Sequence, residues 1–200
     1  MSAAATDFLC SNVIIYDTIV LTLFTEMIFL EFSQVIKERY SCKKYDGRKI
    51  SDEQLTRILE AGRLAPTAKN LQEQHIYVAN TPEVLAVIDK HTPCRYNAGT
   101  VLIVAFNKDN VYTYPNSTRQ SGIEDATIVA THLILAAADI GIDSCWVNCV
   151  DIDALKADLG LPDNEEILML LDLGFAEKGA GPLPNHSLRK ELSETVTYLK

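Results

Sequence analysis

Positive charge is scarce in this chain. Its 200 residues carry 18 Lys and Arg against 27 Asp and Glu, which gives a formal net charge of −9. Nucleic-acid binding needs a broad basic surface, so this balance excludes nucleic acid as the main partner. No Lys or Arg precedes Lys37, and the positively charged start that a secretory signal needs is therefore missing.

A long charge-free apolar run is also missing. Residues 8–30 are apolar, but Asp17 and Glu26 interrupt them, and the longest run between charges is too short to cross a bilayer as a helix. We therefore expect no membrane partner. Three interpretations of residues 1–26 remain: an extra buried or dimer-covering helix, a weak anchor, or a leader that is not native to the mature domain. We favour the last, with Met27 as the natural start of one domain over residues 27–200.

The cysteines lack a regular spacing, and they are Cys10, Cys42, Cys94, Cys145 and Cys149. Cys145 and Cys149 are spaced C-x3-C, but the chain has no second close pair of cysteines. No metal site is therefore expected. An odd count of irregularly spaced cysteines indicates reduced thiols, and we therefore expect a cytoplasmic protein.

The motifs of the common catalytic sites are missing as well. The chain has no G-x-S-x-G elbow, no H-E-x-x-H, no P-loop and no G-x-G-x-x-G. The four histidines are scattered, and Cys149 has no basic partner nearby in the sequence. No side chain is therefore predicted to be catalytic.

What is present is a clear pattern of helices and strands. Apolar periodicity and capping residues predict helices over 32–39, 51–64, 82–90, 123–140 and 152–160, with a short helix near the C-terminus. The predicted caps are a capping box of Ser51 with Gln54, Thr81 followed by Pro82, and Asp151. Apolar runs predict strands over 75–80, 100–106, 144–150 and 166–175, and the second of these is apolar enough to be buried on both faces. The helix over 123–140 has almost no polar face, so it is expected to be buried centrally or in a subunit interface. This order indicates an α+β or α/β domain with one sheet.

Two polar segments are candidates for a binding site. Arg39 and Ser41 lie two apart, so an extended backbone would point both to one side. A guanidinium fork and a hydroxyl suit a phosphate group. The amides of the second segment, residues 65–72, suit sugar hydroxyls or ring edges. Taken alone, each segment also fits an ordinary solvated loop.

Several short motifs follow one another in a specific order: R-x-S-x-K at 39–43, A-P-x-x-x-N-x-Q at 65–72, the Ala-rich helix, "GIDSCWVNC", "LGLP", "LDLGF" and a terminal "RK-x-L". From about Leu30 to the C-terminus, this series resembles the nitroreductase family of FMN-dependent oxidoreductases. The resemblance implies an α+β nitroreductase-like fold with a central, mainly antiparallel sheet, surrounding helices and a long buried central helix. It also implies a homodimer with FMN at the subunit interface.

The resemblance implies that the cofactor is held by Arg39, Tyr40, Ser41, Lys43, Pro66, Thr67, Asn70, Gln72, Trp146, Val147, Asn148, Cys149 and Arg189. Arg39, Ser41 and Arg189 would hold the phosphate, and Tyr40 would contribute mainly its backbone. Lys43 would lie beside the pyrimidine edge of the flavin, where a cation favours the reduced, anionic ring.

The other two segments would border the ring. Pro66, Thr67, Asn70 and Gln72 would reach the cofactor, and part of their loop is expected to meet the FMN of the other subunit. The strand end at residues 146–149 would run beside the ring, with a backbone N–H of Asn148 or Cys149 directed at N5. The sequence departs from the family where Glu73 and Gln74 replace a common Pro-Trp pair, and where Asn148 or Cys149 replaces a common Gly. The family's long pocket-covering insertion is also missing, so residues 112–119 are either a lid or a surface loop.

The implied activity is a ping-pong transfer of hydride from NADH or NADPH, through flavin N5, to a small acceptor such as a nitroaromatic or a quinone. Two alternatives remain. One is a flavin-binding dimer without NAD(P)H turnover, and the other is a flavin enzyme of the same fold with dehalogenase or flavin-cleaving activity.

Overall fold

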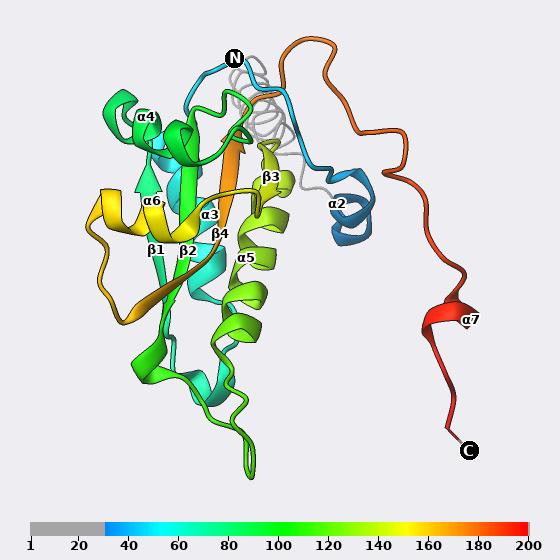
Figure 1. Cartoon of the computed structure of the whole chain (residues 1–200). Coiled ribbons are helices and arrows are strands. Elements are labelled where there is room, and N and C mark those ends of the chain that lie inside the picture. The colour runs from blue at the N-terminus through cyan, green and yellow to red at the C-terminus, as the bar shows by residue number, and fades with distance from the viewer. Residues whose placement is uncertain (1–30, 200) are drawn as a thin grey trace, which may run out of the picture. The chain divides into compact units, whose positions relative to one another are not determined.

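The computed structural model describes residues 31–199, and the predicted extension over 1–26 lies outside them. The compact unit that holds the sheet is Ser33–Lys200. Its helices are α2 Phe32–Glu38, α3 Asp52–Arg63, η1 Ala68–Asn70, α4 Pro82–His91, η2 Lys108–Asn110, α5 Gly122–Asp139, α6 Ile152–Leu159 and α7 Leu192–Thr195. Its strands are β1 Gln74–Ala79, β2 Thr100–Asn107, β3 Asp143–Val147 and β4 Glu165–Gly174 (Figure 1). Across residues 31–199, no helix has both the length and the apolarity needed to cross a bilayer.

The strands form a single antiparallel sheet in the order β1-β2-β4-β3. The central strands β2 and β4 pair along their whole length, from Thr100 opposite Leu173 to Asn107 opposite Glu165. Strands next to each other in the sheet can thus be far apart in the chain, since β2 and β4 are separated by α5, β3 and α6. The predicted α+β class with an antiparallel sheet is confirmed.

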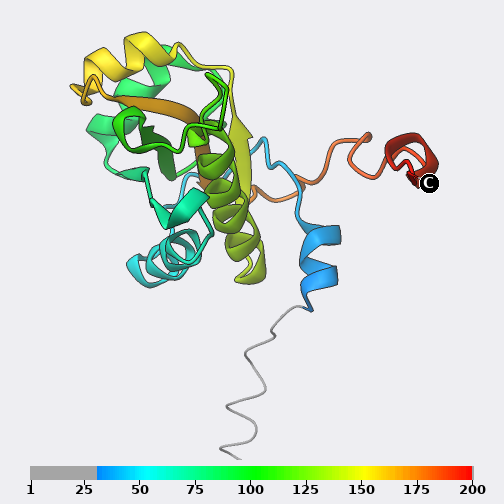
Figure 2. The ribbon, with the colours of Figure 1, turned by 90° about the horizontal axis from the view of Figure 1, so that it is seen from below.

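Side chains along β2 alternate between two cores because successive residues of a strand point to opposite faces. Leu102 and Val104 belong to a cluster with α3 and α5, whereas Val101 and Ile103 belong to a cluster with α4 and α6. Figure 2 shows α3 and α5 on one side of the sheet and α4 and α6 on the other. The prediction that this strand is buried on both faces is confirmed.

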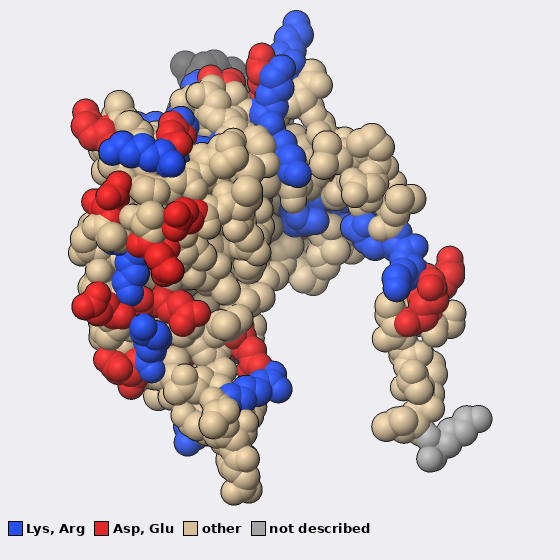
Figure 3. Space-filling model, viewed as in Figure 1, with Lys and Arg blue, Asp and Glu red and all other residues tan. Residues whose placement is uncertain are grey.

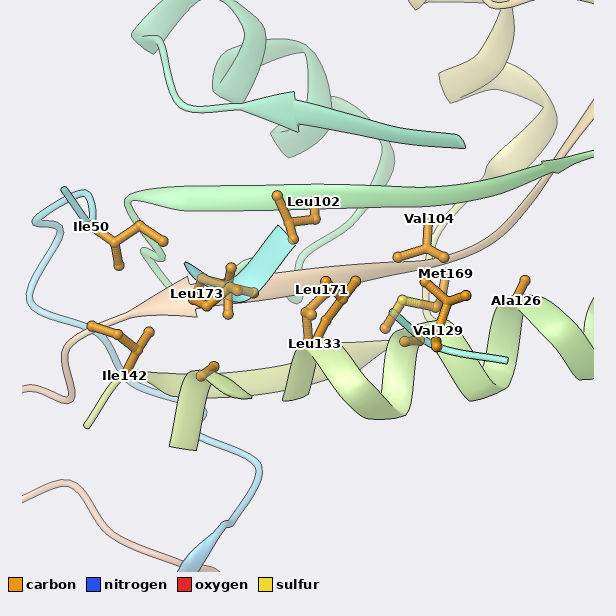
Figure 4. Close-up of a cluster of buried hydrophobic side chains, with 14 of the residues drawn as sticks. Ile50, Leu102, Val104, Ala126, Val129, Leu133, Ile142, Met169, Leu171 and Leu173 are labelled. Carbon is orange, nitrogen blue, oxygen red and sulfur yellow. The ribbon is translucent and has the colours of Figure 1, made fainter. Parts of the chain in front are cut away.

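The long helix α5 packs against α3 and the sheet. Ala126, Val129 and Leu133 point from the helix toward β2 and β4 and are completely buried (Figure 4). Ile123 and Ile128 are 56% and 37% exposed, so the apolar surface extends beyond the face that the chain itself covers.

Local capping signals explain where most helices begin. Ser51 and Gln54 form the predicted capping box at α3, and the carboxylate of Asp151 accepts a hydrogen bond from Ala154 N–H at the start of α6, across 3.2 Å. The predicted start of α4 at Thr81 and Pro82 is confirmed. Thr81 takes the N-cap position without a side-chain hydrogen bond, and the proline at the first helical position begins the helix instead.

Candidate functional site

The residues after α2 run alongside β3, an edge strand of the sheet. The backbone N–H of Cys42 donates to the carbonyl of Ser144 across 2.9 Å, and Ser41 pairs with Ser144 in parallel orientation. The backbone is therefore extended here, and successive side chains point to opposite sides. Cys42 is buried while Ser41 and Lys43 are exposed, so a hydroxyl and an ammonium group are presented together.

A pocket of about 300 Å³ lies beside this pairing. Its walls come from the segment after α2, from β3 and from the C-terminal tail. The lining residues are Tyr40, Ser41, Lys43, Cys145, Trp146, Leu183, Asn185 and His186. The structure thus brings together four predicted site residues from two segments that are about a hundred positions apart in the chain.

The tail contributes a wall that the sequence analysis did not predict. Leu183, Asn185 and His186 line the pocket, and the His186 ring meets the Tyr40 ring edge-on, with 6.4 Å between centroids. The only signal in the sequence was their position a few residues before Arg189. The guanidinium of Arg189 donates to the carbonyl of His186 across 2.5 Å, so it lies beside this wall without lining the pocket.

The cations near the pocket fall into two groups. Lys44 and Arg48 pair with Glu177 and Asp46 across 3.1 and 2.7 Å. By contrast, within residues 31–199 no carboxylate pairs with Arg39, Lys43 or Arg189. Figure 3 shows Lys and Arg side chains over the α2 region and near the start of α7, whereas both signs mix over α4 and α6. The unpaired cations leave positive charge available to an anionic ligand.

The end of β3 presents an oriented aromatic ring. The indole N–H of Trp146 donates to the side-chain oxygen of Asn148 across 2.7 Å, which fixes the ring at the pocket wall. Val147 points the other way and is buried in the core with α4 and α6. Asn148 and Cys149 lie just beyond the strand and are exposed.

The predicted loop residues Pro66, Thr67, Asn70 and Gln72 do not line this pocket. Their loop is anchored at the N-terminal end of α5, where Ala68 N–H donates to the Asp125 carboxylate across 3.0 Å. β3 instead follows the C-terminal end of α5, a helix about 27 Å long at 1.5 Å per residue. Within one chain, the two predicted halves of the site therefore remain separate.

The backbone of this loop is held in an unusual conformation. Lys69, Asn70 and Gln72 have positive φ values of 53°, 55° and 53°. The hydroxyl of Thr67 accepts a hydrogen bond from Gln72 N–H across 3.0 Å, which stabilises the turn. Non-glycine residues in this region are strained and occur often at functional sites.

Beneath the loop lies a pair of buried acids that the sequence analysis missed. Glu73 and Asp125 are 3% and 5% exposed, and each has one side-chain oxygen without a hydrogen-bond partner among the described residues. Ser121 donates to the other oxygen of Glu73 across 3.3 Å. Burial, together with the neighbouring carboxyl of Asp125, raises the pKa of Glu73 to about 7.

A second buried acid lies under the pocket. Asp172 on β4 is 1% exposed, and neither carboxyl oxygen has a hydrogen-bond partner in the part of the chain that the structure describes. Burial raises its pKa to about 9, although the charge of Arg95 opposes the shift. Asp172 is therefore protonated at neutral pH. The phenol of Tyr45 donates a hydrogen bond to the backbone carbonyl of Asp172 across 3.5 Å.

Residues 112–119 form a turn beside the 65–72 loop and do not line the pocket. Tyr114 N–H donates to the carbonyl of Arg119 across 3.0 Å, and the Lys69 ammonium lies 4.6 Å from the centre of the Tyr112 ring. A lid role for this turn stays a prediction.

Comparison with known proteins identifies relatives of this chain in one family. The model of the nitroreductase family matches residues 36–95 and 89–175. A crystal structure of a nitroreductase family protein from Clostridium difficile 630 superimposes with a TM-score of 0.80 and 33% identity, covering 86% of this chain and 99% of that one.

Two further relatives carry functional descriptions. A nitroreductase from Bacteroides fragilis NCTC 9343, crystallised with bound FMN, is 25% identical with a TM-score of 0.67, over 86% of this chain and all (100%) of that chain. A protein from Archaeoglobus fulgidus with the provisional name NADH dehydrogenase/NAD(P)H nitroreductase is 29% identical over 153 residues, which are 72% of this chain and 85% of that protein.

Proposed function

The chain belongs to the nitroreductase family, and we propose that it is an FMN-dependent oxidoreductase that uses NADH or NADPH to reduce a small acceptor. The observation that carries this proposal is the pocket beside β3. There an exposed hydroxyl, an unpaired ammonium group and an oriented indole lie together.

The chemistry of these residues fits FMN. A phosphate dianion needs cationic and hydroxyl donors, and Ser41 and Lys43 supply one of each. Arg39 lies two residues before Ser41, and Arg189 donates to the carbonyl of the pocket residue His186. A flat ring needs an aromatic or apolar wall, which Trp146 provides. The proposed FMN-binding set is the one predicted from the sequence, Arg39, Tyr40, Ser41, Lys43, Pro66, Thr67, Asn70, Gln72, Trp146, Val147, Asn148, Cys149 and Arg189, extended by His186.

Bound FMN would supply the redox chemistry, at N5, that carries reducing equivalents from NADH or NADPH to the acceptor in a ping-pong cycle. The protein contributes binding, orientation and charge. The ammonium group of Lys43 provides a positive field that favours negative charge on its ligand. Trp146 and Asn148 fix one wall, and the backbone at Asn148 and Cys149 remains accessible beyond the strand.

We further propose that two copies of the chain complete each site. The loop from Pro66 to Gln72 does not line the pocket of its own chain, so it is available to the partner's pocket. Large apolar side chains are exposed on α2, α5 and the tail; they are Phe32, Ile36, Ile123, Ile128, Leu183, Leu188, Leu192, Val196, Tyr198 and Leu199. Exposed apolar surface of this extent supports an interface between subunits.

The test is the colour of the purified protein and its response to nucleotide. We expect a yellow protein whose visible flavin band is bleached by NADH or NADPH without oxygen and restored by a nitroaromatic or a quinone. A colourless protein that cannot take up FMN would contradict the proposal. A yellow protein that neither nucleotide bleaches would indicate the flavin-binding alternative. Halide release or loss of the flavin itself would indicate the dehalogenase or flavin-cleaving alternatives.

A further inference from the structure

Two cysteines from distant parts of the chain meet beside the pocket. Cys94 lies in the loop after α4, and Cys149 lies just after β3. The hydroxyl of Thr92 accepts a hydrogen bond from Cys94 N–H across 3.0 Å and donates to the carbonyl of Cys149 across 2.5 Å. Asp151 N–H also donates to the carbonyl of His91 across 3.0 Å. The two loops are therefore joined on both sides of the cysteine pair.

The two thiols interact with each other and differ in character. A hydrogen bond from the Tyr96 hydroxyl lowers the pKa of Cys94, and the Cys149 thiol and the charge of Lys43 lower it further. The hydrogen bond to Cys94 raises the pKa of Cys149. The pKa of Cys94 is thus lowered and that of Cys149 is raised, so Cys94 is the more readily ionised thiol of the two.

Accessibility separates this pair from the other described thiols. Cys149 is exposed and Cys94 is partly exposed, whereas Cys42 and Cys145 are buried. Burial raises the pKa of Cys145 to about 12, which makes that thiol inert. Reaction with a soluble oxidant should therefore begin at Cys94.

We propose that Cys94 and Cys149 form a hydroperoxide-reactive thiol pair that closes reversibly to a disulfide. The Cys94 thiolate attacks the peroxide, the O–O bond breaks, and the leaving oxygen takes a proton and departs as water or an alcohol. Cys94 is then a sulfenic acid. The sulfur of Cys149 attacks the Cys94 sulfur, the S–O bond breaks, water leaves and the S–S bond forms. Two thiols lose two electrons and two protons, and one hydroperoxide is reduced.

The pair adjoins the proposed FMN site, to which Cys149 contributes its backbone, but the peroxide reaction needs no nucleotide, so its test uses the purified full chain without NADH or NADPH. All forms carry Cys10→Ser, because residue 10 lies outside the described residues. The reduced protein is treated with hydrogen peroxide, alkylated and mapped by mass spectrometry. We expect a linked peptide joining Cys94 to Cys149 and a mass loss of two hydrogen atoms, both reversed by dithiothreitol.

Two variants separate the roles of the thiols. Cys149→Ser should stop at the sulfenic acid, which dimedone would trap at Cys94. In Cys94→Ser, the rate at which hydrogen peroxide oxidises the accessible thiol should fall by at least about tenfold, because only the less ionised thiol, Cys149, remains. Cys42→Ala, which removes a buried thiol, should react like the parent protein.

Mapping of the parent protein, which carries Cys10→Ser alone, can overturn the proposal even if a further variant folds poorly. Retention of both thiols under peroxide, or a disulfide that excludes either residue, would contradict it. So would equal rates for Cys94→Ser and the parent protein, with circular dichroism confirming that both are folded.

Discussion

The backbone N–H of Cys42 and the carbonyl of Ser144 are joined by a hydrogen bond of 2.9 Å. This single contact places the segment after α2 against the edge strand β3, and the pocket follows from it. Ser41 and Lys43 reach the pocket from one strand-like segment, and Trp146 reaches it from the other.

Replacing Lys43 with alanine should weaken FMN binding. A hydrogen bond to a charged group contributes roughly 1.5–3 kcal/mol, so FMN affinity should fall by at least about tenfold. Lys44→Ala is the matched control, because the neighbouring ammonium is paired with Glu177 and does not line the pocket. Titration of the apoprotein with FMN, followed by flavin fluorescence, measures both. Equal losses for the two variants would refute a specific role for Lys43.

The buried acid Glu73 should make stability depend on pH. Its pKa is raised from 4.5 to about 7 in the folded protein. Stability from this group is therefore fully present below pH 4.5 and is lost as the pH rises through 7. Glu73→Gln should flatten this part of the curve and gain stability relative to the parent at pH 8. Thermal unfolding from pH 4.5 to 8 measures the effect, and parallel curves for the two proteins would contradict it.

Asp172 should extend the same trend to higher pH. Its pKa is raised from 3.8 to about 9 by burial, so the stability of the folded state falls as the pH rises from 3.8 through 9. Asp172→Asn keeps the shape without the titration and should lose less stability between pH 7 and 9. Glu166→Gln, an exposed position on the same strand, is the control and should follow the parent. Denaturant midpoints at several pH values would reveal the difference or its absence.

Gly99 should tolerate no side chain. A Cβ at this position would lie 2.3 Å from the backbone carbonyl carbon and oxygen of Arg48, and a backbone cannot move aside as a flexible side chain can. Gly99→Ala should therefore lower the free energy of unfolding by about 1–3 kcal/mol or more. Gly181→Ala, where no atom lies within 4 Å of the added Cβ, is the control. Urea unfolding of both variants checks the prediction, which fails if their midpoints coincide.

Much of the secondary structure could be read directly from the sequence. The capping box at Ser51 and the continuous apolar run of β2 depend only on neighbouring residues, and both were predicted correctly. Thr81 is the N-cap of α4 as predicted, although its hydroxyl makes no capping hydrogen bond and the proline after it begins the helix. The family resemblance also depended on local motifs, and the family match confirms it.

Contacts between residues far apart in the sequence were decided by the tertiary structure alone. Glu73 with Asp125, Cys94 with Cys149 and Ser41 with Ser144 each join residues about fifty or more positions apart. No periodicity or spacing encodes such contacts, because they arise from the sheet order β1-β2-β4-β3 and from the packing of α3 and α5 on one face. The sequence by itself therefore determined the elements and the family. Only the fold decided which acids share a buried site, which cysteines are brought together through Thr92 and which cations remain unpaired, since burial and distance set pKa values and reactivity.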